Sequence, residues 1–360
     1  MGKIMKMFLS CLLAVAVCAG QVVENPAQPP GKKAGRVIRL KEVLRVRDGE
    51  GNFFFREPWE VLAAPNGHFY VLEPDKFYQF DPGSRFVRNL YRKGEGPGEF
   101  NQGLTEAIVG DGEIILASSN VLKIVRMDPR GGRREEVKPQ GTPFTRLLGY
   151  FGGRYGVLTR ERGSMDRAGG IHEDRLKLGF LDGGGLIAPT PAVFPMTYAM
   201  TVSNRSVSMA NISRLLTAPR DARFVYLSTS PSYLVHLLDF EKGTVVQSLR
   251  RDYRRVKMAT KRKTAMDMPE FANDITRLLV YKDLLWVVTS IFDKSKGILV
   301  DVFDRDGRYR DAFYLPLTGI LTEDRWSYYA PLAVSGDFLY HIESGADGEM
   351  SVVKYLIIDS

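Results

Sequence analysis

Short apolar runs that end in an aspartate and a turn residue recur along this chain. The first run is Phe77-Tyr78-Gln79-Phe80-Asp81, followed by Pro82-Gly83, and the later runs end at Asp128, Asp182, Asp239, Asp304 and Asp359. These aspartates are 47, 54, 57, 65 and 55 residues apart. A motif that returns after about 50 residues indicates a repeat architecture. Aspartate suits this position because its carboxylate accepts hydrogen bonds from backbone amides in a turn.

Each repeat also contains a hairpin pattern upstream of its aspartate. The clearest pair of apolar runs is 60–64 and 69–72, separated by Pro65-Asn66-Gly67, and similar pairs lie within 107–116, 278–288 and 332–340. Asn-Gly and Asp-Gly between apolar runs favour tight hairpin turns. A further strand is expected after the aspartate turn, at 86–90, 245–249 and 309–315. Four strands in about 54 residues predict the blade of a β-propeller. Residues 183–212 are the least regular part of the pattern.

The two ends of the repeat region complement each other. The last unit ends at Asp359, where its fourth strand should begin, and the strand-like run 37–46 has no unit of its own. We therefore expect this early strand to complete blade six and close the ring, which removes exposed sheet edges. The predicted fold is all-β: a six-bladed β-propeller over residues 37–360 with four-stranded antiparallel blades, the last closed by the N-terminal strand.

The stretch Arg92-Lys93-Gly94-Glu95-Gly96-Pro97-Gly98-Glu99-Phe100 separates the first two units. Its glycines and proline do not support a helix or a central strand. A phosphate-binding loop would require Gly-Lys-Ser/Thr and a following helix, and a dinucleotide fingerprint would open a helix. Here a strand-like run, 105–109, follows instead. The stretch is interpreted as a tight crossover between blades.

The segment 94–100, placed after a strand-turn-strand unit that ends in Phe80-Asp81, resembles the NHL-repeat-like and TolB-like six-bladed β-propellers that bacteria export. The motif occurs once, and the looser resemblance covers about residues 37–360. The resemblance implies a family described mostly by its fold. Some propellers are enzymes, lyases or lactone hydrolases, that hold a divalent metal at the axis with His, Asp, Glu or Asn. A metal-dependent propeller enzyme is therefore the alternative function.

The N-terminus predicts export. Residues 1–20 have a basic start, an apolar core from Phe8 to Val17 and small residues after it, the pattern of a signal peptide. The apolar core is too short for a membrane span, so no transmembrane segment is predicted. A lipid anchor at Cys18 is the less favoured alternative, because Val17 stands where a small residue is expected. Residues 21–36 are rich in Pro, Gln, Gly and Lys and are interpreted as a linker. A periplasmic or extracellular location is expected.

Composition adds two constraints. The chain carries 26% charged and 44% hydrophobic residues with a formal net charge of +8, an ordinary globular composition with a mild basic bias. No cysteine follows Cys18, so the exported part contains no disulfide and needs a large core. A basic cluster runs from Arg250 to Lys263. In an exported protein it suits a cell-surface polyanion or an acidic partner better than nucleic acid, and the alternative is a solvated outer strand and loop.

Catalytic and metal-binding patterns are absent from the sequence. The four histidines, His68, His172, His236 and His341, fall at different places in the repeat and show no ligand spacing. There is no Gly-x-Ser-x-Gly elbow, no cysteine nucleophile in the exported part and no EF-hand loop. Neither a catalytic residue nor a metal nor a cofactor is predicted.

Three near-identical segments carry the candidate binding site. They are Thr145-Arg146-Leu147-Leu148, Ser213-Arg214-Leu215-Leu216 and Thr276-Arg277-Leu278-Leu279. The first strand of a propeller blade is innermost, so we expect Arg146, Arg214 and Arg277 to line an axial funnel and attract a carboxylate, phosphate or sulfate. The alternative is that each arginine is paired with a carboxylate of a neighbouring blade.

The sequence therefore predicts an exported, monomeric binding module for a protein partner or for an anionic small-molecule or polysaccharide ligand. A third hypothesis is that the chain is a structural surface protein that binds no small ligand. The fold class does not choose among these functions.

Overall fold

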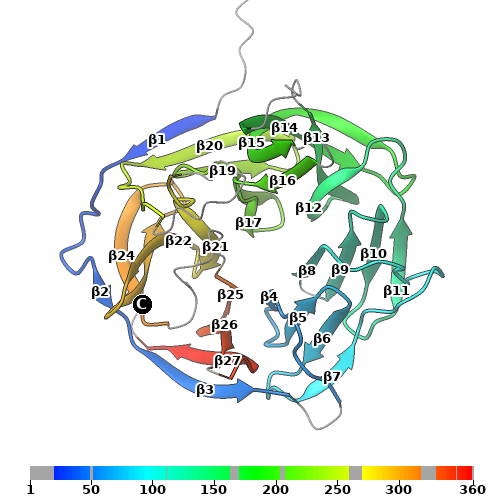
Figure 1. The fold of residues 1–360 in the computed structure, drawn as a ribbon, viewed down its shortest axis with the longest axis horizontal. Coiled ribbons are helices and arrows are strands. Elements are labelled where there is room, and N and C mark those ends of the chain that lie inside the picture. Colours follow the sequence, from blue (N-terminus) through cyan, green and yellow to red (C-terminus); the bar gives the residue numbers. More distant parts are fainter. Residues whose placement is uncertain are drawn as a thin grey trace, which may run out of the picture.

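The computed structural model describes residues 20–48, 52–110, 112–162, 170–202, 207–258, 270–317, 330–345 and 347–358. Within these ranges the chain forms β-strands and no helix, and the strands make six sheets arranged around a central axis (Figure 1). No helix in the described ranges has the length and hydropathy to cross a membrane. The predicted all-β, six-bladed β-propeller is confirmed.

The first three blades follow one another along the chain. Blade 1 contains β4 (Glu60–Ala63), β5 (Phe69–Glu73), β6 (Lys76–Phe80) and β7 (Phe86–Asn89). Blade 2 contains β8 (Glu106–Gly110), β9 (Glu113–Ser118), β10 (Lys123–Met127) and β11 (Arg133–Val137). Blade 3 contains β12 (Phe144–Phe151), β13 (Arg154–Glu161), β14 (Gly170–Leu181) and β15 (Ile187–Val202), with β16 (Val207–Asn211) as a fifth strand.

The other three blades each recruit a strand from the N-terminal region. Blade 4 contains β17 (Leu216–Pro219), β18 (Phe224–Ser228), β19 (Leu234–Asp239) and β20 (Thr244–Arg251), with β1 (Gln21–Asn25) added. Blade 5 contains β21 (Ile275–Tyr281), β22 (Leu284–Asp293), β23 (Gly297–Phe303) and β24 (Tyr309–Leu315), with β2 (Arg36–Val37) added. Blade 6 contains β25 (Leu332–Ser335), β26 (Phe338–Ser344), β27 (Met350–Ile357) and β3 (Leu40–Val46).

The predicted aspartate turns connect the third and fourth strands of blades 1 to 5. The Asp128 carboxylate accepts hydrogen bonds from the backbone N–H groups of Arg130 (2.8 Å) and Gly132 (3.0 Å). Asp304 does the same for Asp306 (3.0 Å) and Arg308 (2.9 Å). These hydrogen bonds are the reason for the repeated aspartate, and they lower the pKa of Asp128. The sixth aspartate, Asp359, lies outside the described residues.

The core lies between the blades. Each of the six junctions between neighbouring blades holds a cluster of buried apolar side chains from both blades. Strand β5 shows the pattern, because Phe69 and Val71 pack toward blade 6 while Tyr70 and Leu72 pack toward blade 2. Successive side chains of a strand point to opposite faces, so a blade buried on both faces reads as a continuous apolar run.

Ring closure occurs as predicted. Strand β3 pairs antiparallel with β27, with Val46 opposite Val352, and so supplies the fourth strand of blade 6. The Arg45 guanidinium on β3 is 2.7 Å from the Glu343 carboxylate on β26 and donates to Ser351 Oγ on β27 (3.0 Å). The sheet and this ion pair join the two ends of the repeat region.

Residues 21–36, for which the sequence predicts a linker, form a strap along the outside of the ring. Strand β1 pairs in parallel with β20, and β2 pairs in parallel with β24 (Figure 1). The Asn25 amide crosses from blade 4 to blade 5, because its Nδ2 donates to Arg250 O and Gly307 O (both 3.0 Å) and its Oδ1 accepts from Tyr309 N (2.8 Å). Polar composition concealed these strands, since a strand on a sheet edge needs little apolar surface of its own.

The stretch 92–100 is a crossover between blades 1 and 2, as predicted. Phe100 N donates to Arg92 O (2.9 Å), and the Phe100 side chain enters the core between these blades. Lys123 Nζ, from β10, donates to Glu99 O (2.7 Å) and Gly96 O (3.2 Å). Lys123 thus holds the glycine-rich backbone in a structural role.

We expect Asn25→Ala to lower the free energy of unfolding by about 1–3 kcal/mol, because it removes three hydrogen bonds that join the strap to blades 4 and 5. Urea-induced unfolding measures this change. Lys33→Ala is the matched control, since Lys33 is exposed on the same strap and its replacement should change stability by less than about 0.5 kcal/mol. Equal stabilities of the two variants would contradict a stabilising role for the strap.

Candidate functional site

A cavity of ≈ 290 Å³ lies where the innermost strands of the blades meet. All six blades contribute to its wall, through β4, β8, β12, β17, β21 and β25. Four charged side chains stand among mostly apolar neighbours: Glu60, Glu106, Arg146 and Arg277. The cavity lies at the axis, where the sequence places a candidate binding funnel, and two of the three candidate arginines line it.

The repeat places these four charged residues at equivalent positions. Each lies near the start of its inner strand and pairs with an apolar residue of the second strand: Glu60 with Leu72, Glu106 with Ala117, Arg146 with Leu158 and Arg277 with Val288. Because the blades repeat around one axis, side chains at one register position lie at one level of the channel.

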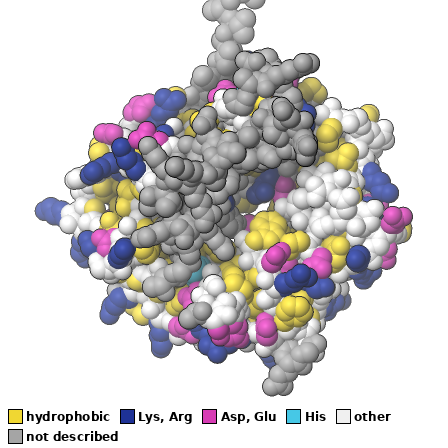
Figure 2. All heavy atoms as spheres, viewed as in Figure 1, with side chains coloured by type: hydrophobic (Ala, Val, Ile, Leu, Met, Phe, Trp, Pro, Cys, Tyr) yellow, Lys and Arg dark blue, Asp and Glu magenta, His cyan; other side chains and the backbone are white. Residues whose placement is uncertain are grey.

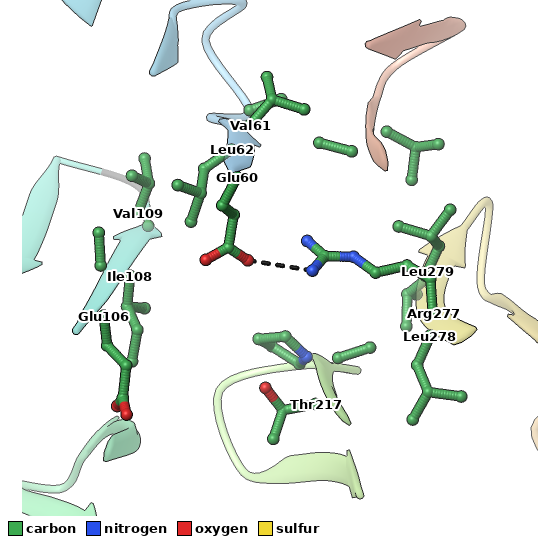
Figure 3. A pocket seen from close by; sticks show the side chains of 18 of the residues that line it. Glu60, Val61, Leu62, Glu106, Ile108, Val109, Thr217, Arg277, Leu278 and Leu279 are labelled. Carbon is green, nitrogen blue, oxygen red and sulfur yellow. Dashed lines mark hydrogen bonds and ion pairs between the residues drawn. The ribbon is translucent and has the colours of Figure 1, made fainter. Parts of the chain in front are cut away.

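An ion pair crosses the channel between blades 5 and 1. Arg277 Nη1 donates to Glu60 Oε1 (3.0 Å), and Figure 3 shows the two side chains pointing toward one another. Their side chains are 14% and 10% exposed. This pairing is the alternative that the sequence left open for Arg277.

A second, looser ion pair joins blades 2 and 3. Arg146 Nε lies 3.6 Å from Glu106 Oε1, beyond hydrogen-bond distance, and the side chains are 30% and 5% exposed. Across the described part of the chain, the Arg146 guanidinium makes this contact and no hydrogen bond. Its donors can therefore bind a ligand in the channel.

The Glu106 carboxyl has an unusual environment. The backbone N–H of Leu147 donates to its Oε2. Burial raises the pKa of Glu106 to about 7; Arg146 and the Leu147 N–H act against this shift, while the Glu60 carboxylate adds to it. Glu106 is thus close to half-protonated at neutral pH, which is common at functional sites.

The third predicted arginine is placed differently. Arg214 lies two residues before β17, is half-buried and does not line the cavity. Blade 4 contributes Thr217 instead, which faces the cavity in Figure 3. The similarity of Ser213-Arg214-Leu215-Leu216 to the other two segments does not match the strand register, because β17 begins only at Leu216.

Glu60 and Glu106 belong to no motif that the sequence predicts as a site, because the three matching segments share an arginine at this position. Thr105-Glu106-Ala107-Ile108 has the same pattern as Thr145-Arg146-Leu147-Leu148, with the opposite charge. A search of the repeat position for any charged residue would have found Glu106.

The remaining candidate residues lie apart from this cavity. His236 is half-buried between two strands, with Nδ1 2.8 Å from Ser248 Oγ, and His341 is fully buried in blade 6. In the described ranges no three His, Cys, Asp or Glu side chains are grouped closely enough to hold a metal ion.

The basic cluster at 250–263 is partly internal. Arg251 Nε pairs with Asp301 (2.9 Å) and Arg255 Nε pairs with Asp274 (3.0 Å), so two of its members neutralise buried carboxylates. Lys261, Arg262 and Lys263 lie outside the described residues. On the face shown in Figure 2, basic and acidic side chains alternate around the rim instead of forming a patch of one sign.

The fold and this cavity define a six-bladed β-propeller with a charged axial site. Two solved bacterial structures share the fold. A "Putative exported protein" of Bacteroides fragilis has a TM-score of 0.51 and 11% identity, covering 94% of this chain and 100% of that chain. A member of the DUF4221 family from Bacteroides vulgatus has a TM-score of 0.56 and 10% identity, covering 90% and 99%. No family model and no curated protein matches this chain. These likenesses show the fold and confirm the resemblance at that level.

We expect Glu106 by itself to lower the unfolding free energy of the protein, by of order 3 kcal/mol, as pH rises from about 4.5 to about 7. The unfolded carboxyl releases its proton near its ordinary pKa of 4.5, whereas the folded one keeps it until about 7. In this window the folded state holds the extra proton, so raising the pH favours unfolding. Above about 7 the contribution of Glu106 stops changing.

Urea unfolding of wild type and Glu106→Gln at several pH values isolates this contribution, because other titrating groups act in both proteins. The difference between the two should change across the window. Glu24→Gln, an exposed residue of β1, is the control and should follow the wild type. A Glu106→Gln variant with the wild-type pH dependence would show that Glu106 ionises normally.

Proposed function

We propose that this protein is an exported binding module that holds an anionic group of a small ligand in its axial channel. The fold supports this, since the axis of a propeller brings side chains from every blade to one site. The neighbour from Bacteroides fragilis, described as exported, and the signal-peptide pattern of residues 1–20 support export to the periplasm or beyond the cell. We infer a soluble, cleaved product and a monomer, with a lipid anchor at Cys18 less favoured.

The observation that carries the proposal is that Arg146 is partly exposed in the cavity and only loosely paired. Its guanidinium is partly exposed in a cavity lined mostly by apolar residue types, and its contact with Glu106 is long, at 3.6 Å. A guanidinium has five N–H donors in a planar fork that matches carboxylate and phosphate. In a low-dielectric cavity a charge-assisted pair of this kind is stronger than in water.

Protonation of a neighbouring carboxylate can compensate the negative charge of a bound anion. The four charged side chains carry no net charge when both glutamates are ionised. When an anion engages Arg146, Glu106 can take up a proton, because its pKa is already about 7. Charge balance is then kept while Arg277 and Glu60 stay paired. Anion binding is therefore expected to be tighter at pH 6 than at pH 8.

A metal-dependent lyase or hydrolase is less well supported. Glu60 and Glu106, the carboxylates of the channel, each face a guanidinium, and two arginines beside them would repel a divalent cation. The donor set of the cavity does not fit the axial metal site of such enzymes.

The test is the shift in melting temperature of the residue 21–360 protein when acetate, sulfate or phosphate is added. A ligand that binds the native state alone stabilises it by RT ln(1 + [L]/Kd), which is about 2.7 kcal/mol at a concentration of 100 Kd. We expect the anions to stabilise the wild type and to lose most of this effect in Arg146→Gln, because the amide has no charge and fewer donors.

Two control variants distinguish anion binding in the channel from nonspecific attraction of anions to a basic protein. Arg254→Gln removes an exposed arginine of the basic cluster, and Arg214→Gln removes the predicted arginine that lies outside the cavity. Both should keep the anion-dependent shift, measured relative to the melting temperature of each variant. If folded Arg146→Gln responds to anions as the wild type does, the channel is not the anion site.

A further inference from the structure

The wall of the axial cavity changes character along the axis. The six inner strands run in the same direction, because every blade repeats one topology around the ring. The charged residues stand at the strand starts, and the following residues are apolar: Leu62, Val109, Val280 and Val334. All four are only partly buried, so apolar surface remains open to the cavity. The cavity has a charged end and an apolar end.

The length of the cavity along the axis follows from strand geometry. From Arg277 to Val280, or from Glu60 to Ala63, three residues at about 3.3 Å each give about 10 Å along the axis. Thr217, Ala218 and Pro219 of β17 line the same length on the side of blade 4. The apolar part can therefore accept an extended group several carbon atoms long.

The size of the cavity limits the ligand further. At ≈ 290 Å³ it lies just below the usual range for small-molecule pockets, about 300–1,000 Å³. A polysaccharide or a folded partner does not fit within it. The site calls for a compact molecule with a single polar end.

The charge of that polar end is set by which groups remain available. Glu60 is engaged by Arg277 at 3.0 Å, and Glu106 is almost fully buried and accepts a hydrogen bond from Leu147 N–H. Arg146 is the more exposed member of its pair and makes no hydrogen bond within the described residues. An anion at Arg146 is favoured over a cation at either carboxylate.

We propose that the ligand of the axial channel is a small monocarboxylate with an apolar body, its carboxylate on Arg146 and its hydrocarbon part along Leu62, Val109 and Val280. This rests on the anion site proposed above and adds the ligand class and its orientation. The apolar body supplies affinity by leaving water, and the guanidinium fixes which end enters first.

The experiment is a calorimetric titration of the residue 21–360 protein with acetate, butanoate, hexanoate and octanoate. The dissociation constant should fall with each added methylene, by up to about fourfold, which corresponds to ~0.8 kcal/mol of buried CH₂. The gain should stop when the apolar end is full. Hexanol and hexylammonium are the matched probes, and both should bind at least tenfold more weakly than hexanoate.

Variants at the two ends of the cavity give separate readouts. Arg146→Gln should weaken all the carboxylates alike. Val280→Thr keeps the shape of the side chain but adds a hydroxyl, so it should reduce the gain per methylene and weaken octanoate binding more than acetate binding. Val43→Thr, on an exposed position of β3, is its control and should alter neither.

The outcomes distinguish this inference from the function on which it rests. If acetate and sulfate bind through Arg146 but longer chains bring no gain, the anion site stands and the apolar ligand class is wrong. If hexylammonium or hexanol binds as tightly as hexanoate, the assigned polar end is wrong. If no anion binds in an Arg146-dependent way, both proposals fail.

Discussion

Every blade of this propeller buries apolar side chains on both faces, and a single blade cannot do so alone. Each of the six apolar clusters contains residues of two neighbouring blades, so the burial of every blade depends on the blades on either side of it. Burial of this area is the dominant stabilising term in a chain that has no cysteine after Cys18. Closure by β3 matters for the same reason, because an open ring would leave two apolar blade faces in water and the edge of β27 without its partner.

The closed ring also decides what happens at the axis. Its inner strands converge, so charged residues at their starts are brought into one small cavity among apolar neighbours. Charges in such a space must be paired or neutralised. Arg277 and Glu60 meet this requirement with a hydrogen-bonded ion pair, whereas Arg146 and Glu106 meet it loosely, through a long contact and a raised carboxyl pKa. The looser pair is the part of the axis that can respond to a ligand.

The strap covers strand edges and encloses a second buried charged group on the outside of the ring. Strands β1 and β2 cover outer edges of blades 4 and 5 before β3 completes blade 6. Beneath the strap, Asp301 is fully buried and accepts hydrogen bonds from Tyr233, Tyr309 and Arg251, and the Arg251 guanidinium also donates to Ala27 O. Part of the basic cluster therefore stabilises the junction between blades 4 and 5, and its density in the sequence does not by itself indicate a polyanion site.

The local patterns were sufficient for the repeat, the turn role of Asp128 and its equivalents, the crossover at 92–100 and the closure by a strand within residues 37–46. Each of these depends on interactions within one blade, on the connection between consecutive blades, or on a strand whose partner is missing, and all three can be read along the chain. The pairing of residues far apart could not be read in this way. Arg277 and Glu60 are neighbours because both side chains extend into the channel from blades 5 and 1, on either side of blade 6, and Arg214 misses the cavity because β17 begins two residues after it. Register and distance across the axis come from the packing of all six blades together, so only the tertiary structure decided which charges share the site.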